Sequence, residues 1–446
     1  MKRSWKVSFT AFTLRGDNRL YQSLVSENVE PKAYLMYCCR IEAVMWFLLA
    51  VLLAQSADFA AEGLKALDAQ KYDDAVALFS KAVAADPKDY SAHFNLGLAY
   101  SLLNKDTEAI SEYKTVLELH PALYEAELNL GISLVRSKDA AGAVPHLRSA
   151  ADQKPREFRP QFYLAEALFA DGKFAEAEAA YRAALDLNAN SAPAEIGIAR
   201  SFARERRLTD AEPHYRKAAS LDGSYKNMLL ELATLYEDNH QPDKAIDLFR
   251  EFPANPGAQE RLGALLLQSD RSADAIPPLE FAVAQSPTPA NRLALAQAYV
   301  HEKQLAKAEP LAAQALEAAP EDVSLRLFYA RLLRDQRKFP PAEQQFLAVV
   351  QRKPDSSEAW SELSGVYMVT EQYPQALAAL DRVRALGAET IGHVFVRALA
   401  FDHLHQAKDA VENYNRFLAA SHGEHPDQEF QARQRAKTLE RELGKR

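Results

Sequence analysis

Apolar and polar positions follow a helical period along most of the chain, in paired segments separated by short polar turns. Residues 90–123 show one pair clearly: two amphipathic runs flank the turn 104–106, and Pro121 ends the second run. Near the start of that run, Ala109 belongs to a ladder of alanines spaced 34 residues apart. The ladder comprises Ala75, Ala109, Ala143, Ala177, Ala211 and Ala245, resumes at Ala275 after 30 residues and at Ala308 after 33, and continues at Ala342, Ala376 and Ala410. This period predicts a repeat protein built from helix pairs.

Each repeat carries two small residues and one large residue at fixed positions, counted from the start of its first helix. The repeats begin near Ser56, Tyr90, Tyr124, Phe158, Ala192, Lys226, Pro256, Pro289, Val323, Ser357 and Ile391. Position 8 is small, position 20 is the alanine of the ladder, and position 24 is aromatic or leucine in most copies. The small residues let two antiparallel helices approach, and the large residue fills the space beside them. A single repeat cannot bury its apolar face alone, so we expect successive repeats to cover one another.

This pattern resembles the tetratricopeptide repeat (TPR) family, whose repeat is also 34 residues long. Several copies end in proline, at Pro87, Pro121, Pro155, Pro287, Pro320 and Pro354. The tryptophan that this family carries at position 4 is present only as Trp360, and His93 takes its place in the second repeat. The resemblance covers about eleven repeats. It implies an all-α fold, a right-handed superhelical solenoid of antiparallel helix pairs.

The irregularities of the pattern predict four segments. These are a leader at 1–56, an N-terminal array of about six repeats at 57–255, a C-terminal array of about five repeats at 256–422, and a capping helix at 423–446. The two arrays are separated where the sixth repeat is four residues short and Pro253 and Pro256 follow closely. The capping helix is expected because a solenoid needs a polar-faced element at its open end.

The leader contains a charge-free apolar run at residues 43–54 (AVMWFLLAVLLA). Arg40 precedes the run, and small residues lie at Ala54 and Ser56. This arrangement predicts an export signal cleaved after Ser56. An uncleaved membrane anchor is the alternative, although 12 residues are short for a bilayer span, which needs about 20.

The front of the leader is unusually long for an export signal, which favours translation starting at Met36. Both cysteines, Cys38 and Cys39, lie in the leader, so a processed chain would contain none. A cysteine-free chain suits an oxidising compartment. We therefore expect an exported protein of a bacterial-type envelope, located in the periplasm or anchored to the membrane.

The charge and the motifs of the chain exclude several classes of function. Residues 57–446 carry a net charge of −11, whereas general nucleic-acid binding needs a basic face. The repeats leave no room for a catalytic domain, and no phosphate-binding glycine loop or catalytic motif is found. The histidines His403, His405, His422 and His425 lie close in sequence, but a zinc site needs three or four converging ligands. We therefore expect no enzyme activity, no cofactor and no metal.

The family resemblance implies that the first helix of each repeat lines a concave groove for extended peptides. Positions 2, 5, 6, 9, 12 and 13 are those usually exposed in that groove. Asn95 and Asn129 occupy position 6 in consecutive repeats, where an amide can bind a peptide backbone through both its donor and its acceptor. The next residue at this position is Tyr163. Arg136, Arg200, Arg204 and Arg331, at positions 9 and 13, are candidates for carboxylates of a partner. Ordinary solvated side chains are the alternative interpretation of this set.

The family also contains a two-carboxylate clamp for acidic C-terminal peptides, built on Lys and Asn at fixed positions. The first repeat has Ala60 and Leu64 there, so binding of such tails is not expected. Our main hypothesis is a non-catalytic scaffold that binds other proteins or extended peptides in the cell envelope. The alternatives are a substrate-recruiting subunit of a separately encoded envelope enzyme and a membrane-anchored assembly factor.

Overall fold

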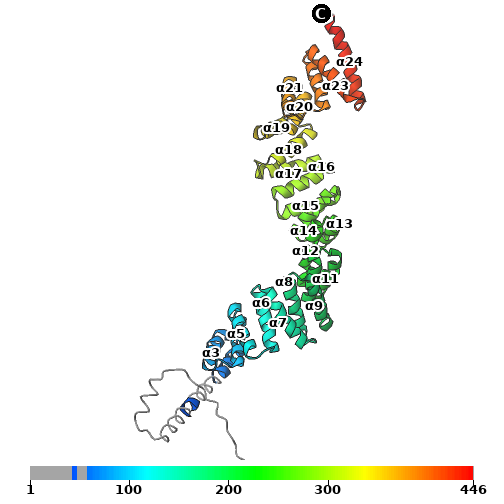
Figure 1. Cartoon of the computed structure of the whole chain (residues 1–446). Helices are drawn as coiled ribbons and strands as arrows, with labels where there is room; N and C mark the ends of the chain where they lie inside the picture. The colour runs from blue at the N-terminus through cyan, green and yellow to red at the C-terminus, as the bar shows by residue number, and fades with distance from the viewer. Residues whose placement is uncertain (1–42, 48–57, 445–446) are drawn as a thin grey trace, which may run out of the picture. The chain divides into compact units, whose positions relative to one another are not determined.

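The computed structural model describes residues 43–47 and 58–444, and all regular secondary structure in these ranges is helical (Figure 1). Residues 43–47 form a short helix whose side chains are exposed. The remainder of the predicted leader, including its proposed cleavage site and both cysteines, lies outside the described residues. No helix within the described ranges combines the length and the apolar character needed to cross a bilayer.

The chain divides after Gly223 into two compact units. The first unit contains a helix over residues 58–68, α3 (Tyr72–Ala85), α4 (Tyr90–Leu102), α5 (Asp106–Leu119), α6 (Tyr124–Arg136), α7 (Ala140–Gln153), α8 (Phe158–Ala170), α9 (Phe174–Leu187), α10 (Ala192–Arg204) and α11 (Leu208–Leu221). The short 3₁₀ helix η1 (Gly223–Asn227) spans the division. The second unit contains α12 (Met228–Asp238), α13 (Pro242–Arg250), α14 (Pro256–Gln268), α15 (Ser272–Gln285), α16 (Pro289–His301), α17 (Leu305–Ala318), α18 (Val323–Asp335), α19 (Phe339–Arg352), α20 (Ser357–Val369), α21 (Tyr373–Ala385), α22 (Ile391–His403), α23 (Ala407–Ser421) and α24 (Pro426–Leu443).

The predicted helix pairs are present throughout the described repeats. From the second repeat onward, each first helix begins at the residue expected from the sequence, except in the sixth repeat. There η1 covers the expected start at Lys226, and α12 begins at Met228. The boundary between the two compact units also lies close to Lys226. The break that we predicted from Pro253 and Pro256 falls inside the second unit, where α13 contacts α14.

The packing rule expected for positions 8 and 24 is confirmed in atomic detail. A Cβ atom added to Gly97 would lie 2.9 Å from the ring of Tyr113, and one added to Gly131 would lie 2.3 Å from Cγ of Leu147. Both large side chains are fully buried. Ala312, the small residue in place of a large one, is also buried. The glycines are therefore explained by the close approach of the neighbouring helix.

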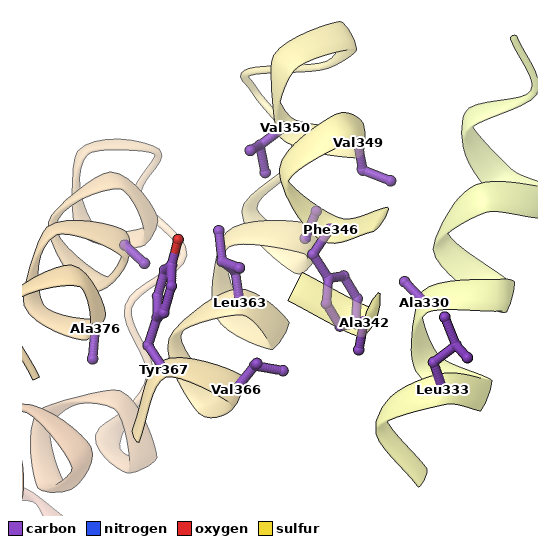
Figure 2. Close-up of a cluster of buried hydrophobic side chains, with 12 residues drawn as sticks. Ala330, Leu333, Ala342, Phe346, Val349, Val350, Leu363, Val366, Tyr367 and Ala376 are labelled. Carbon is purple, nitrogen blue, oxygen red and sulfur yellow. The ribbon is translucent and has the colours of Figure 1, made fainter. Parts of the chain in front are cut away.

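Successive repeats share one core instead of forming separate ones. In the second unit, Phe346 of α19 lies between α18 and α20, close to Ala330 and Leu363 (Figure 2). Tyr367 of α20 lies beside Ala376 of α21 in the same cluster. The cluster therefore joins two repeats, as expected for a solenoid stabilised by contacts between nearest neighbours.

The two ends of the array are polar. At positions 3, 7 and 10 the second repeat has the buried residues Ala92, Leu96 and Ala99, but the first repeat has the exposed charges Asp58, Glu62 and Lys65. These charges make the outer side of the first repeat unsuitable for covering by another apolar helix. At the other end, α24 contacts α23 and buries Ala432, Ala436 and Leu439, while its remaining surface is largely charged.

Candidate protein-interaction face

The candidate site consists of positions 2, 5, 6, 9, 12 and 13 of successive first helices, which we call the first-helix face. In the first unit these helices are the helix over residues 58–68 and α4, α6, α8 and α10, and from α4 onward each contacts the next. In the second unit they are α12, α14, α16, α18, α20 and α22. Many polar side chains of these faces are engaged in ion pairs, and others have no partner among the described residues.

Asn95 on α4 and Asn129 on α6 are half-buried and occupy equivalent positions. Neither side chain makes a hydrogen bond to any residue in the part of the chain that the structure describes. An amide group in this state is available to another polypeptide, because it offers both a donor and an acceptor. The structure thus places the two predicted amides on neighbouring helices with their hydrogen-bonding capacity unused.

Half-buried apolar side chains occupy other positions of the same face on α4 and α6. Phe94 and Leu98 lie on α4, and Ile132 and Val135 lie on α6. The sequence reasoning concentrated on polar candidates and missed this group. Its signal was present, because these residues occupy positions 5, 9 and 12 of the same two repeats, where a freely solvated helix would carry polar residues.

Tyr163 on α8 extends the face with an aromatic group. Its ring is half-buried and lies 5.5 Å from the ring of Phe162, which stacks on Phe158 at 5.4 Å. The guanidinium of Arg159 lies over Tyr163, 5.8 Å from the ring centroid. Such a pair adds weak attraction between the cation and the ring.

Position 6 carries an amide on α4 and α6, Tyr163 on α8 and no side chain on α10. The next residue at position 6 is Gly197 on α10, and a Cβ atom there would lie 2.3 Å from the ring of Tyr181. The hydroxyl of Tyr181 donates a hydrogen bond to Glu166, and burial raises the pKa of this tyrosine well above its ordinary value. Any side chain at position 197 would displace this ring, so core packing excludes an amide at position 6 of α10.

Two of the four predicted arginines pair with carboxylates, and the other two lie near aromatic side chains. Arg136 donates to Asp106 through Nε at 2.9 Å, and Arg331 donates to Glu362 at 2.9 Å and also pairs with Glu358. These two arginines connect neighbouring repeats. Arg204 lies over the ring of Phe174 at 5.0 Å and has no carboxylate within 4.0 Å among the described residues. Arg200 is half-buried within electrostatic reach of Tyr181.

On the second unit, charged residues of the first-helix face pair with one another across repeats. Arg261 on α14 contacts Glu237 on α12 at 2.8 Å and donates to Thr234 at 3.1 Å. Arg334 on α18 pairs with Glu362 on α20, which also accepts from Arg331. These ion pairs satisfy groups that would otherwise be available to a partner.

The side chain of Asp402 on α22 is bound by an arginine of the capping helix, α24. Arg435 of α24 donates two hydrogen bonds to it, at 2.8 and 2.7 Å, and the Tyr414 hydroxyl donates a third at 3.1 Å. The bonds from Arg435 lower the pKa of Asp402 below its ordinary value. This arrangement fixes α24 on the last repeat.

Polar pairs at positions 4 and 23 take the place of the tryptophan expected at position 4. His93 contacts Glu112, His146 contacts Glu127 and His214 contacts Glu195, each with Nδ1 2.6 Å from a carboxylate oxygen. The order of the two residue types is reversed in the second repeat relative to the third and fifth. In the ninth repeat, Arg326 donates to Gln345 at 2.7 Å across the same positions. These contacts join the two helices of one repeat, so we assign them to the stability of the fold.

Two of the four C-terminal histidines stack on aromatic side chains. His403 stacks on Tyr373 at 4.6 Å, and His425 stacks on Phe417 at 6.3 Å. Over the described ranges, no three His, Cys, Asp or Glu side chains are grouped so that they could hold a metal ion.

Solved structures similar to parts of this chain include two of MamA and one of YrrB. MamA of MSR-1 is 27% identical, covers 38% of this chain and 97% of its own, and has a TM-score of 0.36. MamA from Desulfovibrio magneticus RS-1 is 19% identical, with coverages of 38% and 96% and a TM-score of 0.37. YrrB, described as a TPR protein with an unusual peptide-binding site, is 19% identical, with coverages of 37% and 85% and a TM-score of 0.36. No curated protein sequence matches the chain.

Two family models of the tetratricopeptide repeat match the sequence itself. One matches residues 60–123, 128–192, 196–259 and 260–323, and the other matches residues 299–361. Together these matches cover well over half of the 446 residues. They include the repeats that carry Asn95 and Asn129, and the helix pairs described above follow the same period. The chain belongs to the tetratricopeptide repeat family.

Proposed function

We propose that this chain is a non-catalytic scaffold that binds other proteins, and that it takes extended segments of them along the first-helix face of its first unit. The observation that carries the proposal is the pair of half-buried amides, Asn95 and Asn129, which have no hydrogen-bond partner within the described residues. Membership of a repeat family that occupies most of the chain also supports a binding role over a catalytic one.

The physical reason is that each amide keeps a donor and an acceptor that a peptide backbone can bind. Water reaches Asn95 and Asn129 in the free protein, since both are half-buried, and a peptide backbone can replace that water with a donor and an acceptor of its own. The surrounding apolar side chains would gain from being covered at the same time. Polar and apolar parts of the face therefore favour the same kind of ligand.

We further propose that the protein acts in the envelope of a bacterial-type cell, after export to the periplasm. The apolar run at residues 43–54, preceded by Arg40, and the absence of cysteine after Cys39 support this location. N-terminal sequencing of the purified protein, together with cell fractionation, tests it. A protein that keeps its first residue and stays in the cytoplasmic fraction would overturn the location.

The binding function is tested by affinity purification of the full chain from its own cells, with mass spectrometry of the bound proteins. Asn95→Lys combined with Asn129→Lys places two long cations on the face and should release the specific partners. Gln297→Lys is the matched control, because Gln297 is a half-buried amide on the first-helix face of the second unit. If the double variant retains every partner of the unmodified chain, binding does not occur through this face.

A further inference from the structure

Ion pairs occupy part of the first-helix face of the second unit. On the second unit, Arg261, Arg331 and Arg334 each pair with a carboxylate of a neighbouring first helix. A partner that approached them would have to break these pairs and replace them. Exposed pairs of this kind contribute little each, but removing one member leaves its partner without a counter-charge.

On the first unit, α4 and α6 present no unpaired charge at the positions of the face. The two charged residues there are Glu125 and Arg136. Glu125 lies 3.8 Å from Lys154, and Arg136 donates to Asp106 at 2.9 Å. The remaining positions carry apolar side chains, serines and the two free amides. A charged group of a partner would lose water here without gaining an opposite charge.

The spacing of the two amides suits an extended chain. Asn95 and Asn129 occupy the same position on helices that contact each other, and packed helices lie about 8–10 Å apart. An extended chain advances about 3.3 Å per residue, so the amides would meet backbone groups about three residues apart. Side chains between these contacts would lie against Phe94, Leu98 and Ile132, which are half-buried and apolar.

We propose that the face formed by α4 and α6 recognises an extended, uncharged apolar segment of a partner protein. This inference rests on the proposed binding function and adds the chemistry and the place of recognition. Asn95 and Asn129 hold the backbone of the segment, and the apolar side chains select against Asp, Glu, Lys and Arg in its centre.

The probe for this proposal is a fluorescently labelled nine-residue peptide of alternating leucine and serine, measured by anisotropy with the full chain. Two further peptides replace two central serines with aspartate or with lysine. We expect the neutral peptide to bind at least about tenfold more tightly than either charged one, since an unpaired charge is costly to desolvate. Equal or tighter binding of a charged peptide, or no binding of the neutral one, overturns the proposal.

Variants locate the binding. Asn95→Ala with Asn129→Ala should weaken binding of the neutral peptide about tenfold, because two hydrogen-bonding amides are removed. Gln297→Ala, the matched change on the second unit, should leave binding unchanged. Circular dichroism must show that both variants keep their helices. An effect of Gln297→Ala as large as that of the double variant would place the site elsewhere.

A fourth peptide, with the sequence of residues 43–54, distinguishes a segment of a partner protein from the leader of the chain itself as the ligand of the face. If it binds more tightly than the neutral probe and displaces it, the face serves the leader of the chain itself, and the assignment to a partner protein is wrong. If partners are lost from the lysine double variant in cells but the neutral peptide does not bind, the scaffold function stands and only the proposed chemistry fails.

Discussion

At the scale of single residues, the contact between positions 4 and 23 shows how this chain does without the tryptophan of its family. In the second repeat a histidine at position 4 meets a glutamate at position 23, and in the third and fifth repeats the two residue types are exchanged. The same distance in all three shows that either order fits between the helices. The contact thus depends on a complementary pair and not on one residue type.

Exchanging the pair in the fifth repeat tests this interpretation. His214→Ala leaves Glu195, whose side chain is only 10% exposed, without its partner, and should cost about 2 kcal/mol of stability. Glu195→His combined with His214→Glu reproduces the order found in the second repeat and should recover most of that loss. Urea unfolding followed by circular dichroism measures both. If the exchanged variant is as unstable as His214→Ala, the pair is not interchangeable.

At this scale, a repeating pattern predicts only the features that recur from repeat to repeat. The alanine ladder and the residues at positions 8 and 24 were predictable, because they recur in nearly every repeat. The state of a single arginine was not: Arg136 and Arg331 are engaged by Asp106 and by Glu358 and Glu362, which lie about 30 residues away in the chain. Pairing positions 4 and 23 along the sequence would have revealed the histidine–glutamate contacts.

At the scale of the helix, the late start of α12 has a local explanation. The other first helices from α4 onward follow a proline shortly before their start, a capping side chain immediately before it, or both. Asp89 and Ser191, for example, accept hydrogen bonds from the first turns of α4 and α10. Before Lys226 the equivalent residues are Gly223 and Tyr225, which provide neither. The helix starts later because neither Gly223 nor Tyr225 can stop the preceding turn or cap a helix that begins at Lys226.

This junction is also where the compact units part, and the sequence reasoning had placed the division at Pro253 and Pro256. Pro256 lies at the first position of α14, where its missing N–H has little cost. Asn255 caps the same helix by accepting from the N–H of Ala258 at 3.0 Å.

The capping helix provides a prediction at the same scale. Truncation after Gly423 removes α24 and uncovers the cluster of Tyr414 and Phe417, which Ala432, Ala436 and Leu439 cover. The lost apolar burial should lower the local opening free energy of α22 and α23 by about 3 kcal/mol. Hydrogen exchange should accelerate in these helices and stay unchanged in α3 to α11, since contacts extend only to neighbours. Arg441→Ala, an exposed change on α24, is the control; unchanged exchange in α23 would contradict the prediction.

At the scale of the whole molecule, the two units share their packing scheme but differ on the surface. Both bury a large residue at position 24 against a small one, which accounts for the common fold. In the second unit, ion pairs such as Arg261–Glu237 occupy charged positions of the first-helix face, whereas the amides of α4 and α6 in the first unit have no hydrogen-bond partner among the described residues. Family membership determines the packing and leaves this surface free to vary, so the difference could not be derived from the repeat.

Buried tyrosines make the stability of the molecule sensitive to alkaline pH. Burial raises the pKa of Tyr113 to about 12, and it raises those of Tyr181 and Tyr414 as well. An unfolded chain releases the tyrosine proton near its ordinary pKa of about 10. Between these two values the folded state holds more protons than the unfolded state, so the free energy of unfolding decreases as the pH rises.

Tyr113 alone should account for a loss of about 2–3 kcal/mol between pH 10 and pH 12, at about 1.4 kcal/mol per pKa unit. Below pH 10 its contribution is fully present, because both states keep the proton. Tyr113→Phe cannot ionise, so it should unfold with a shallower dependence on pH across this window, at the cost of a weak bond to Ser101. Tyr90→Phe, at an exposed tyrosine, is the control. Urea unfolding midpoints at pH 8, 10 and 11.5 provide the comparison. An equally steep loss in Tyr113→Phe and in the unmodified chain would show that other groups cause the alkaline unfolding.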